Sequence, residues 1–386
     1  GRSMNGTTFP PHEFGDSEFS NSGGNNEQRS YQGGRNDYQG GQNSQGGQGG
    51  GSWKERNQAG GQQNNQGGQG GGNRSWGSGG GQSGYQKKPW NAIPVETFAE
   101  FRTNGNRTRY EEASFGIRKQ FVCLVMAEIM QGRGRFLPSI RKGLHYFIEK
   151  EPWWGIPAHY PKDHPEKDIQ PVDLFNAETA SMLAWTLYML EDEINRKEKG
   201  LCDQVRSEIE RRFLQPVLNQ PQGWKNNANN WNTWITSNWL ETVLICESDA
   251  KQRDAAFKGV QQCLRTFMKG YPDDGGCEEG VSYWDCAGAS FFESLYFMQF
   301  APKQAVLTLN EAQKKKVENM GRFITTMYIN DLTFVNFSDA QAQNVPNINI
   351  LFPYGAYLQN EQMMQLEVYV AKKYLYMQKP SELYRK

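Results

Sequence analysis

From about residue 94 onward the sequence repeats one pattern. Apolar side chains recur every three or four residues, in stretches separated by turn-forming residues. This spacing places the apolar side chains on one face of an α-helix, and strand signals are almost absent apart from residues 332–337. The pattern predicts about nine helices of roughly 15 to 24 residues, at 109–130, 136–150, 172–190, 202–218, 232–247, 251–269, 284–300, 310–328 and 354–377.

Helices of this length, joined by alternately short and long loops, pack as antiparallel hairpins. We therefore predict an all-α fold, an incomplete α/α toroid of stacked helical hairpins, with a solenoid of helical pairs as the alternative. In a toroid the helices alternate between an inner and an outer ring, and the long loops gather at one end of the inner ring. Three long loops stand out, at residues 153–159, 226–234 and 271–284.

Residues 1–86 differ from the rest in composition. They hold 26 of the 42 glycines, together with runs of Gln, Asn and Ser and almost no aliphatic side chains. Such a segment cannot bury enough apolar surface to offset the entropy of folding, so we predict a disordered tail followed by a helical domain over 87–386. A solvated tail is one interpretation. RNA contact through arginine and aromatic stacking is the other, although Lys and Arg are sparse there.

Charge and cysteine content exclude several classes of protein. With 42 basic and 42 acidic side chains the net charge is zero, so nothing in the overall composition indicates nucleic acid. The six cysteines form no metal-ligand spacing and fit reduced thiols, with a Cys277–Cys286 disulfide as the disfavoured alternative. No apolar run is long enough to cross a bilayer, and no signal peptide is visible. Metal-binding, phosphate-binding and serine-nucleophile motifs are absent from the sequence, so no cofactor is expected.

Two of the long loops hold residue types suited to binding a sugar. An Asn amide, such as that of Asn230, donates to a carboxylate oxygen without adding charge. The alternative is that Asn230 or a neighbour only caps the following helix. Tyr283 lies at the start of a later helix, where it could donate or accept a proton. The alternative is a tyrosine whose ring packs in the core.

Carboxylates and one histidine offer a second chemistry. Glu178, together with Asp274 and Glu278 of the acidic loop, fits a glycoside hydrolase, in which two carboxylates flank the bond that breaks. The alternative is that these acids cap and orient their loop. His159 is the best placed of the four histidines, because it lies in an aromatic loop bounded by prolines.

In order and spacing, six segments resemble the heparinase II/III-like polysaccharide lyases. The resemblance covers about residues 95–377. It implies an α/α toroid followed by a β-sandwich, with the sugar cleft between them. The segments that carry it are 104–112, 154–159, 173–179, 229–232, 274–284 and 334–340.

The resemblance also implies a reaction, β-elimination at a uronic acid. In this family an Asn or His neutralises the uronate carboxylate, and a Tyr, often with a His, exchanges protons with C5 and the glycosidic oxygen. Carried over by motif, Asn230, or its neighbour Asn229, neutralises the carboxylate. Tyr283 moves the protons, with His159 as a further catalytic candidate. The implied sugar-binding residues are Trp154, Glu178, Trp231, Asn232, Trp234 and Trp284.

Beyond the site, the resemblance implies an acidic polysaccharide as substrate and a periplasmic or secreted location. Two departures matter: the chain ends about where the β-sandwich is expected to begin, and residues 1–86 stand where the first toroid helices are expected. A separate β-sandwich chain or a homo-oligomer is therefore an expected partner. A non-catalytic glycan-binding scaffold is the alternative function.

Overall fold

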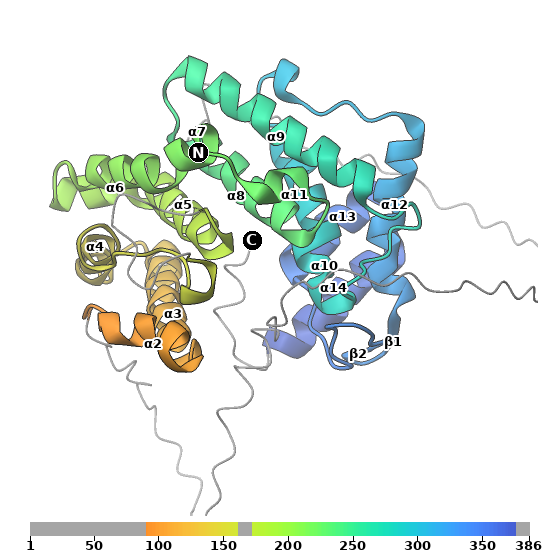
Figure 1. The fold of residues 1–386 in the computed structure, drawn as a ribbon, viewed down its shortest axis with the longest axis horizontal. Coiled ribbons are helices and arrows are strands. Elements are labelled where there is room, and N and C mark those ends of the chain that lie inside the picture. Colours follow the sequence, from red (N-terminus) through yellow and green to blue (C-terminus); the bar gives the residue numbers. More distant parts are fainter. Residues whose placement is uncertain (1–89, 161–171, 376–386) are drawn as a thin grey trace, which may run out of the picture. The chain divides into compact units, whose positions relative to one another are not determined.

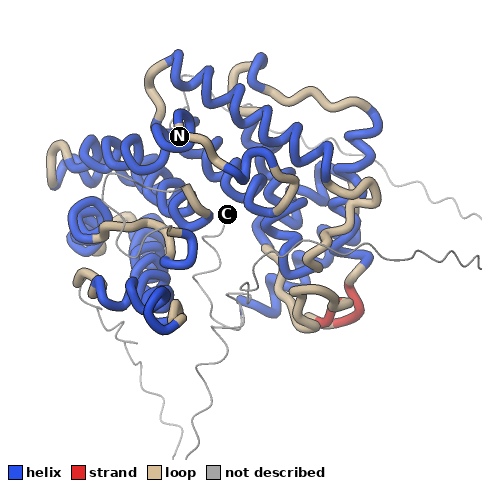
Figure 2. Tube along the Cα trace, viewed as in Figure 1, coloured by secondary structure: helices blue, strands red, loops and turns tan. Residues whose placement is uncertain are grey.

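The computed structural model describes residues 90–160 and 172–375 (Figure 1). The tail predicted over residues 1–86 lies outside the described residues. Within the described ranges the regular secondary structure is helical apart from one antiparallel two-stranded sheet, which confirms the all-α class (Figure 2). The α-helices and strands are α2 (Val95–Asn104), α3 (Thr108–Gln131), α4 (Leu137–His145), α5 (Leu174–Lys197), α6 (Leu201–Ile209), α7 (Gln215–Asn219), α8 (Asn230–Cys246), α9 (Ala250–Gly270), α10 (Val281–Trp284), α11 (Ser290–Met298), α12 (Glu311–Thr326), β1 (Tyr328–Asn330), β2 (Thr333–Phe334), α13 (Ile348–Leu358) and α14 (Glu361–Leu375).

Short 3-10 and π-helical turns complete the helical path. Three predicted helices each contain one π-helical turn, in which the hydrogen bonds widen to the fifth residue. The π turns are η2 (Tyr146–Lys150), η4 (Glu210–Leu214) and η6 (Asp285–Ala289), and the 3-10 turns are η3 (Pro157–His159), η5 (Gly223–Asn226) and η7 (Lys303–Ala305). The η6 turn joins α10 to α11, so residues 281–298 follow one helical path.

The structure differs from the sequence predictions in one unpredicted helix, one helix that is divided and one strand that is shorter. Helix α2 was not predicted. The helix expected over 354–377 is two helices, because Gln359 adopts a left-handed conformation with φ of 52° and Asn360 begins a new helix by accepting from the backbone N–H of Met363 at 3.1 Å. The strand expected over 332–337 is limited to the two residues of β2.

Helices α3, α5, α8, α10–α11 and α13 run parallel to one another. Their side chains meet in pairs whose residue numbers rise together, which is the mark of a parallel arrangement. The pairs are Phe115 with Phe175, Arg118 with Thr179, Glu178 with Trp234, Ser181 with Glu241, Thr233 with Cys286, Trp185 with both Glu241 and Phe297, Asp285 with Asn347, and Phe292 with Tyr354. The N-terminal ends of these helices therefore point the same way.

Helix α9, which follows α8 in sequence, runs in the opposite direction to it. Gly259 lies against the ring of Trp239 and Gly270 against Ala228. A side chain at Gly259 would collide with the indole, so the close approach of the two helices requires glycine at this position. Helix α8 lies next to both α5 and α11 (Figure 1) and is buried along almost its whole length. The main apolar core surrounds it.

A half-buried histidine ties α4 to the end of α5. The Nδ1 atom of His145 lies 2.6 Å from Glu149, and its Nε2 atom lies 2.6 Å from Glu198. Partial burial lowers the pKa of His145, but the hydrogen bonds to the two carboxylates outweigh it, so the net shift is upward. Arg141 also binds Glu198, at 2.9 Å.

His145→Gln is expected to destabilise the protein more at acidic than at alkaline pH. Because the folded-state pKa is raised, the stabilisation is fully present below the unfolded-state pKa of about 6.5 and is lost as the pH rises through the folded-state value. We expect a loss on the order of 0.5–1 kcal/mol near pH 5.5 and almost none near pH 9, measured by denaturant unfolding. Arg141→Gln is the control, because its partner is the same Glu198 but arginine does not titrate. Equal losses for His145→Gln at both pH values would contradict this account.

Candidate functional site

The loops predicted to form a site meet at the N-terminal ends of the parallel helices. Helix α5 begins after Asp173, α8 begins after Asn229 and α10 begins after Gly280. The 3-10 turn η3, which holds His159, lies against the start of α5 and the start of α8. Residues as far apart in sequence as His159 and Trp231, 72 positions, are thereby neighbours.

His159 is held between two aromatic rings and a carboxylate. Its Nδ1 atom lies 2.8 Å from the Oδ2 atom of Asp173. Its ring stacks on Phe175 with 6.1 Å between ring centroids, and it packs edge-to-face with the ring of Trp231 with 4.6 Å between centroids. The His159 side chain is 18% exposed, so the imidazole is confined but reachable from solvent.

Trp234 and Glu178 form the next contact along the same two helices. The indole Nε1 of Trp234 donates to Oε1 of Glu178 at 2.9 Å. Trp234 is buried, and its ring also meets Phe175 edge-on. Glu178 is half-buried, so the pair presents a carboxylate beside an aromatic surface. The predicted residues His159, Trp231, Trp234 and Glu178 are brought together in this way.

Asn230 lies against the acidic loop that contains Glu279. Its amide Nδ2 donates to Oε2 of Glu279, and Asn230 itself is buried. Burial raises the pKa of the Glu279 carboxyl, the hydrogen bond from Asn230 lowers it, and the charges of Asp339 and Glu278 raise it; the net shift is upward. Asn229 is exposed and occupies the N-cap position of α8 without a capping bond from its side chain.

Tyr283 lies half-buried in the first turn of α10, with its ring against the main core. The start of α10 is fixed by the segment that follows β2. Gly280, at φ of 84°, fits closely against Ala340, and Ser282 accepts from the backbone N–H of Gln341 at 3.1 Å. The segment after β2 therefore packs against the start of α10.

Three predicted sugar-binding residues are corrected by their burial. Trp154, Asn232 and Trp284 are fully buried, so no sugar can reach them in this structure. The indoles of Trp154 and Trp284 donate to the carbonyls of Phe147 and Met320. The amide of Asn232 donates to backbone carbonyls of its own loop, of which the nearest, that of Asn227, lies at 2.8 Å.

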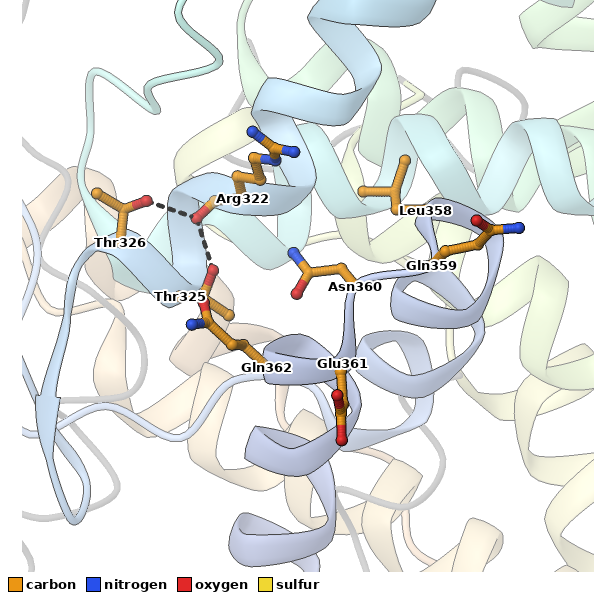
Figure 3. A pocket seen from close by; sticks show the side chains of 8 residues that line it. All are labelled: Arg322, Thr325, Thr326, Leu358, Gln359, Asn360, Glu361 and Gln362. Carbon is orange, nitrogen blue, oxygen red and sulfur yellow. Dashed lines mark hydrogen bonds between the residues drawn. The ribbon is translucent and has the colours of Figure 1, made fainter. Parts of the chain in front are cut away.

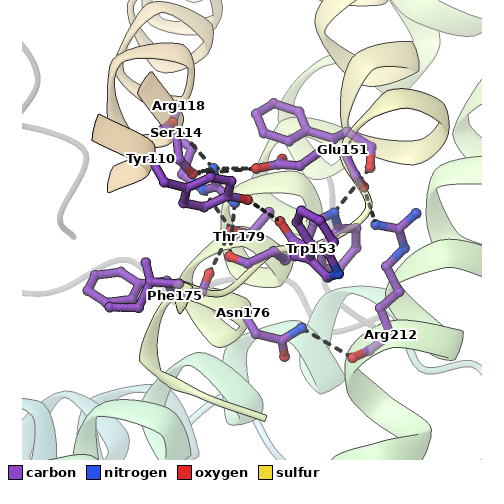
Figure 4. Close-up of polar contacts among 12 residues, drawn as sticks. Tyr110, Ser114, Arg118, Glu151, Trp153, Phe175, Asn176, Thr179 and Arg212 are labelled. Atoms are coloured by element: carbon purple, nitrogen blue, oxygen red, sulfur yellow. Dashed lines mark hydrogen bonds and ion pairs between the residues drawn. The ribbon is translucent and has the colours of Figure 1, made fainter. Parts of the chain in front are cut away.

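Sequence reasoning missed the buried charges that hold the loop before His159. Arg118 of α3 donates to Thr179, to Oε1 of Glu151 and to the carbonyl of Trp154, at 2.8–2.9 Å (Figure 4). Arg212 donates to the carbonyl of Glu151 at 2.7 Å from the other side. Nothing in the sequence pairs these residues, because the contacts span 33 to 61 positions. An apolar helix face interrupted by a single Arg was the only available signal.

A hollow of about 340 Å³ lies elsewhere, between the end of α12 and the turn from α13 to α14 (Figure 3). None of the predicted catalytic or sugar-binding residues given above lines it. It is bordered by the side chains of Arg322, Thr325, Thr326, Leu358, Gln359, Asn360, Glu361 and Gln362. The hollow and the N-terminal helix ends are two different places for a ligand. We favour the N-terminal helix ends, because aromatic rings, a histidine and carboxylates come together there and not at the hollow.

Arg118→Met is expected to be strongly destabilising, because it leaves the Glu151 carboxylate, 1% exposed, without its ion partner. The cost is roughly 3–5 kcal/mol in the free energy of unfolding, and the double variant Arg118→Met, Glu151→Gln is expected to lose less than the single one. The exposed pair Arg196–Glu193 supplies the control: Arg196→Met should cost less than about 1 kcal/mol. A loss below about 1 kcal/mol for Arg118→Met would show that the network does not hold the loop.

Neither metal nor membrane is indicated by the part of the chain that the structure describes. It brings no three metal-ligating side chains together, and none of its helices is long and apolar enough to cross a bilayer. No family model matches the chain, and no curated protein matches it either. The function therefore has to be argued from the geometry of the site.

Proposed function

We propose that the protein is a polysaccharide lyase that cleaves uronic-acid-containing polysaccharide by β-elimination. The scaffold in this proposal is an α/α toroid, of which α3, α5, α8, α10–α11 and α13 are inner helices. Their parallel course, with contacting pairs 53 to 62 residues apart, supports a repeated helical hairpin.

The reaction needs one proton acceptor and one proton donor. A base removes the proton from C5 of the uronate, the bond between C4 and the glycosidic oxygen breaks, and that oxygen takes up a proton. A double bond forms between C4 and C5. The C5 proton is acidic only if the charge of the adjacent carboxylate is neutralised, which is the proposed role of Asn230. Tyr283 and His159 exchange the protons.

The observation that best supports this proposal is the meeting of His159, Trp231, Glu178 and Trp234 at the N-terminal ends of parallel helices. Helix N-termini present backbone N–H groups and a partial positive charge, which favours an anionic ligand. Aromatic rings such as that of Trp231 offer a flat apolar surface to a sugar ring. The negative charge of a uronate and the flat face of its sugar ring would therefore both have a suitable partner at this end of the helices.

One contact favours a second candidate, a glycan-binding protein without turnover. The amide of Asn230 is engaged by the Glu279 carboxylate, which is itself a negatively charged group of the kind that a uronate would bring. A substrate carboxylate has to displace or share this bond. A protein that binds the polysaccharide through the Trp231 surface alone would not need to do so.

Tyr283→Phe and Asn230→Ala are expected to slow cleavage of a uronate polysaccharide strongly, as measured by the ultraviolet absorbance of the unsaturated product. Loss of a proton-transfer group is expected to lower kcat about 10²–10⁴-fold, and loss of the neutralising amide about 10²–10³-fold. The matched controls are Asn226→Ala, an exposed residue of the same loop, and Tyr357→Phe, an exposed tyrosine of α13.

Other outcomes select other functions. If Tyr283→Phe retains its activity, Tyr283 does not transfer the proton as proposed. Reducing ends formed without new absorbance, and lost in Glu178→Gln, indicate a hydrolase. Saccharide binding by calorimetry without any product indicates the glycan-binding alternative.

Glu279→Gln is expected to tighten binding of a uronate oligosaccharide. The substitution keeps an acceptor for the Asn230 amide but removes the negative charge beside it. Removing this repulsion contributes on the order of 1 kcal/mol, or about fivefold in Kd. Calorimetry in the Tyr283→Phe background avoids turnover. Glu278→Gln, its exposed neighbour, is the control and should change Kd less. Weaker binding in Glu279→Gln would show that Glu279 orients Asn230 and does not compete with the ligand.

A further inference from the structure

The carboxylate of Asp173 faces two backbone N–H groups, the Nδ1 atom of His159 and almost no solvent. Its Oδ1 atom accepts from the backbone N–H of Asn176 at 2.7 Å. Its Oδ2 atom accepts from the backbone N–H of Ile156 at 3.3 Å and lies 2.8 Å from Nδ1 of His159. Asp173 is 1% exposed. Both oxygens are thus engaged as acceptors.

This arrangement decides which nitrogen of His159 holds the proton. A neutral imidazole donates from one nitrogen and accepts at the other. Because an ionised carboxylate can only accept, Nδ1 is the donor and Nε2 has the lone pair. None of the residues that the structure describes forms a hydrogen bond with Nε2, and the ring is held between Phe175 and Trp231. Nε2 is therefore available to accept a proton.

Asp173 is itself held in place from two sides. It is the N-cap of α5, so its position is set by the start of that helix. Gly155 of the preceding loop lies so near that a Cβ atom there would be 2.5 Å from Oδ2. Arg118 fixes the same loop by donating to the carbonyl of Trp154. The imidazole therefore has little freedom to turn.

We propose that Asp173 is a positioning residue that holds His159 as the Nδ1–H tautomer and directs Nε2 at the site as a proton acceptor. The role of His159 in catalysis depends on the proposed function, whereas the tautomer does not. Capping alone does not account for the geometry. Asp249 caps α9 by accepting from the backbone N–H groups of Lys251 and Gln252 at 2.9 Å, and it forms no hydrogen bond with a histidine of the part of the chain that the structure describes. Asp173 uses its second oxygen for the loop and the imidazole.

The tautomer is measured directly by long-range ¹H–¹⁵N correlation of the histidine rings in the full chain. Spectra are recorded at a pH at which the ring shifts show His159 to be neutral, and His159→Gln assigns its signals among the four histidines. We expect a protonated Nδ1 and an unprotonated Nε2 in the wild type. Observation of the Nε2–H tautomer there overturns the proposal without the need for any variant at Asp173.

Asp173→Asn tests the cause. An Asn side chain has one acceptor oxygen, which we expect the N–H of Asn176 to retain because its bond, at 2.7 Å, is shorter than that of Ile156 at 3.3 Å. The new NH₂ group then takes the place of Oδ2, so the N–H of Ile156 loses its acceptor and the NH₂ group donates to Nδ1 of His159. The proton then moves to Nε2. Asp249→Asn removes the same kind of capping carboxylate from α9 and should leave the His159 signals unchanged. An unchanged tautomer in folded Asp173→Asn overturns the proposal.

Activity provides the separate readout. If the wild type forms unsaturated product, Asp173→Asn is expected to lower kcat about tenfold to hundredfold with little change in KM, because the base is lost while the sugar-binding surface remains. A wild type with the expected tautomer but without product retains the Asp173–His159 pair and rejects the lyase proposal. A wild type that forms product but has the Nε2–H tautomer at His159 retains the lyase proposal and rejects the proposed role of Asp173.

Discussion

The burial of α8 on all sides is the constraint on which the rest of the fold depends. A helix without a solvent face has to find partners for its polar side chains inside the protein, since an unpaired buried polar group costs about 1–3 kcal/mol. Glu241 receives hydrogen bonds from Ser181 and Trp185 of α5, and Thr233 donates to the carbonyl of Cys286 in η6. These bonds set the register of α8 against both neighbours, which apolar packing alone would leave less sharply defined.

The sequence was sufficient to predict helices and their approximate limits, because apolar periodicity is a local property. It was insufficient where a single backbone conformation decides the result. The left-handed Gln359, which separates α13 from α14, is neither Gly nor Asn, so no turn signal marked it. The 3.6-residue pattern also continues through the π turn η6, so sequence periodicity did not reveal the wider turn that joins α10 to α11. The parallel order of helices depends on contacts between distant segments, which no local pattern encodes.

The candidate site was predictable by residue type but not by role. Loop aromatics and amides drew attention to His159, Asn230 and Trp231, and the structure gives each a defined neighbour. The same reasoning assigned the fully buried Trp154 and Trp284 to sugar binding, because a tryptophan in a motif looks alike whether its ring faces a core or a cleft. Asp173 was overlooked for a related reason. An aspartate before a helix is a common N-cap, so its residue type gave no further signal. The contact of its second carboxylate oxygen with His159 is visible only in the three-dimensional structure.

The direction of the central helices explains how so few residues can affect the whole site. When neighbouring helices run parallel, the loops that precede them all lie at the same end of the helices. The side chains of the first helical turns are then close to one another. A change in the register between α5 and α8 would therefore move His159 against Trp231 and Glu178 against Trp234 together. The polar bonds deep within this layer, such as those of Glu241, are remote from any sugar. Even so, they control the spacing of the groups that would meet one, and this links the stability of α8 to the geometry of the site.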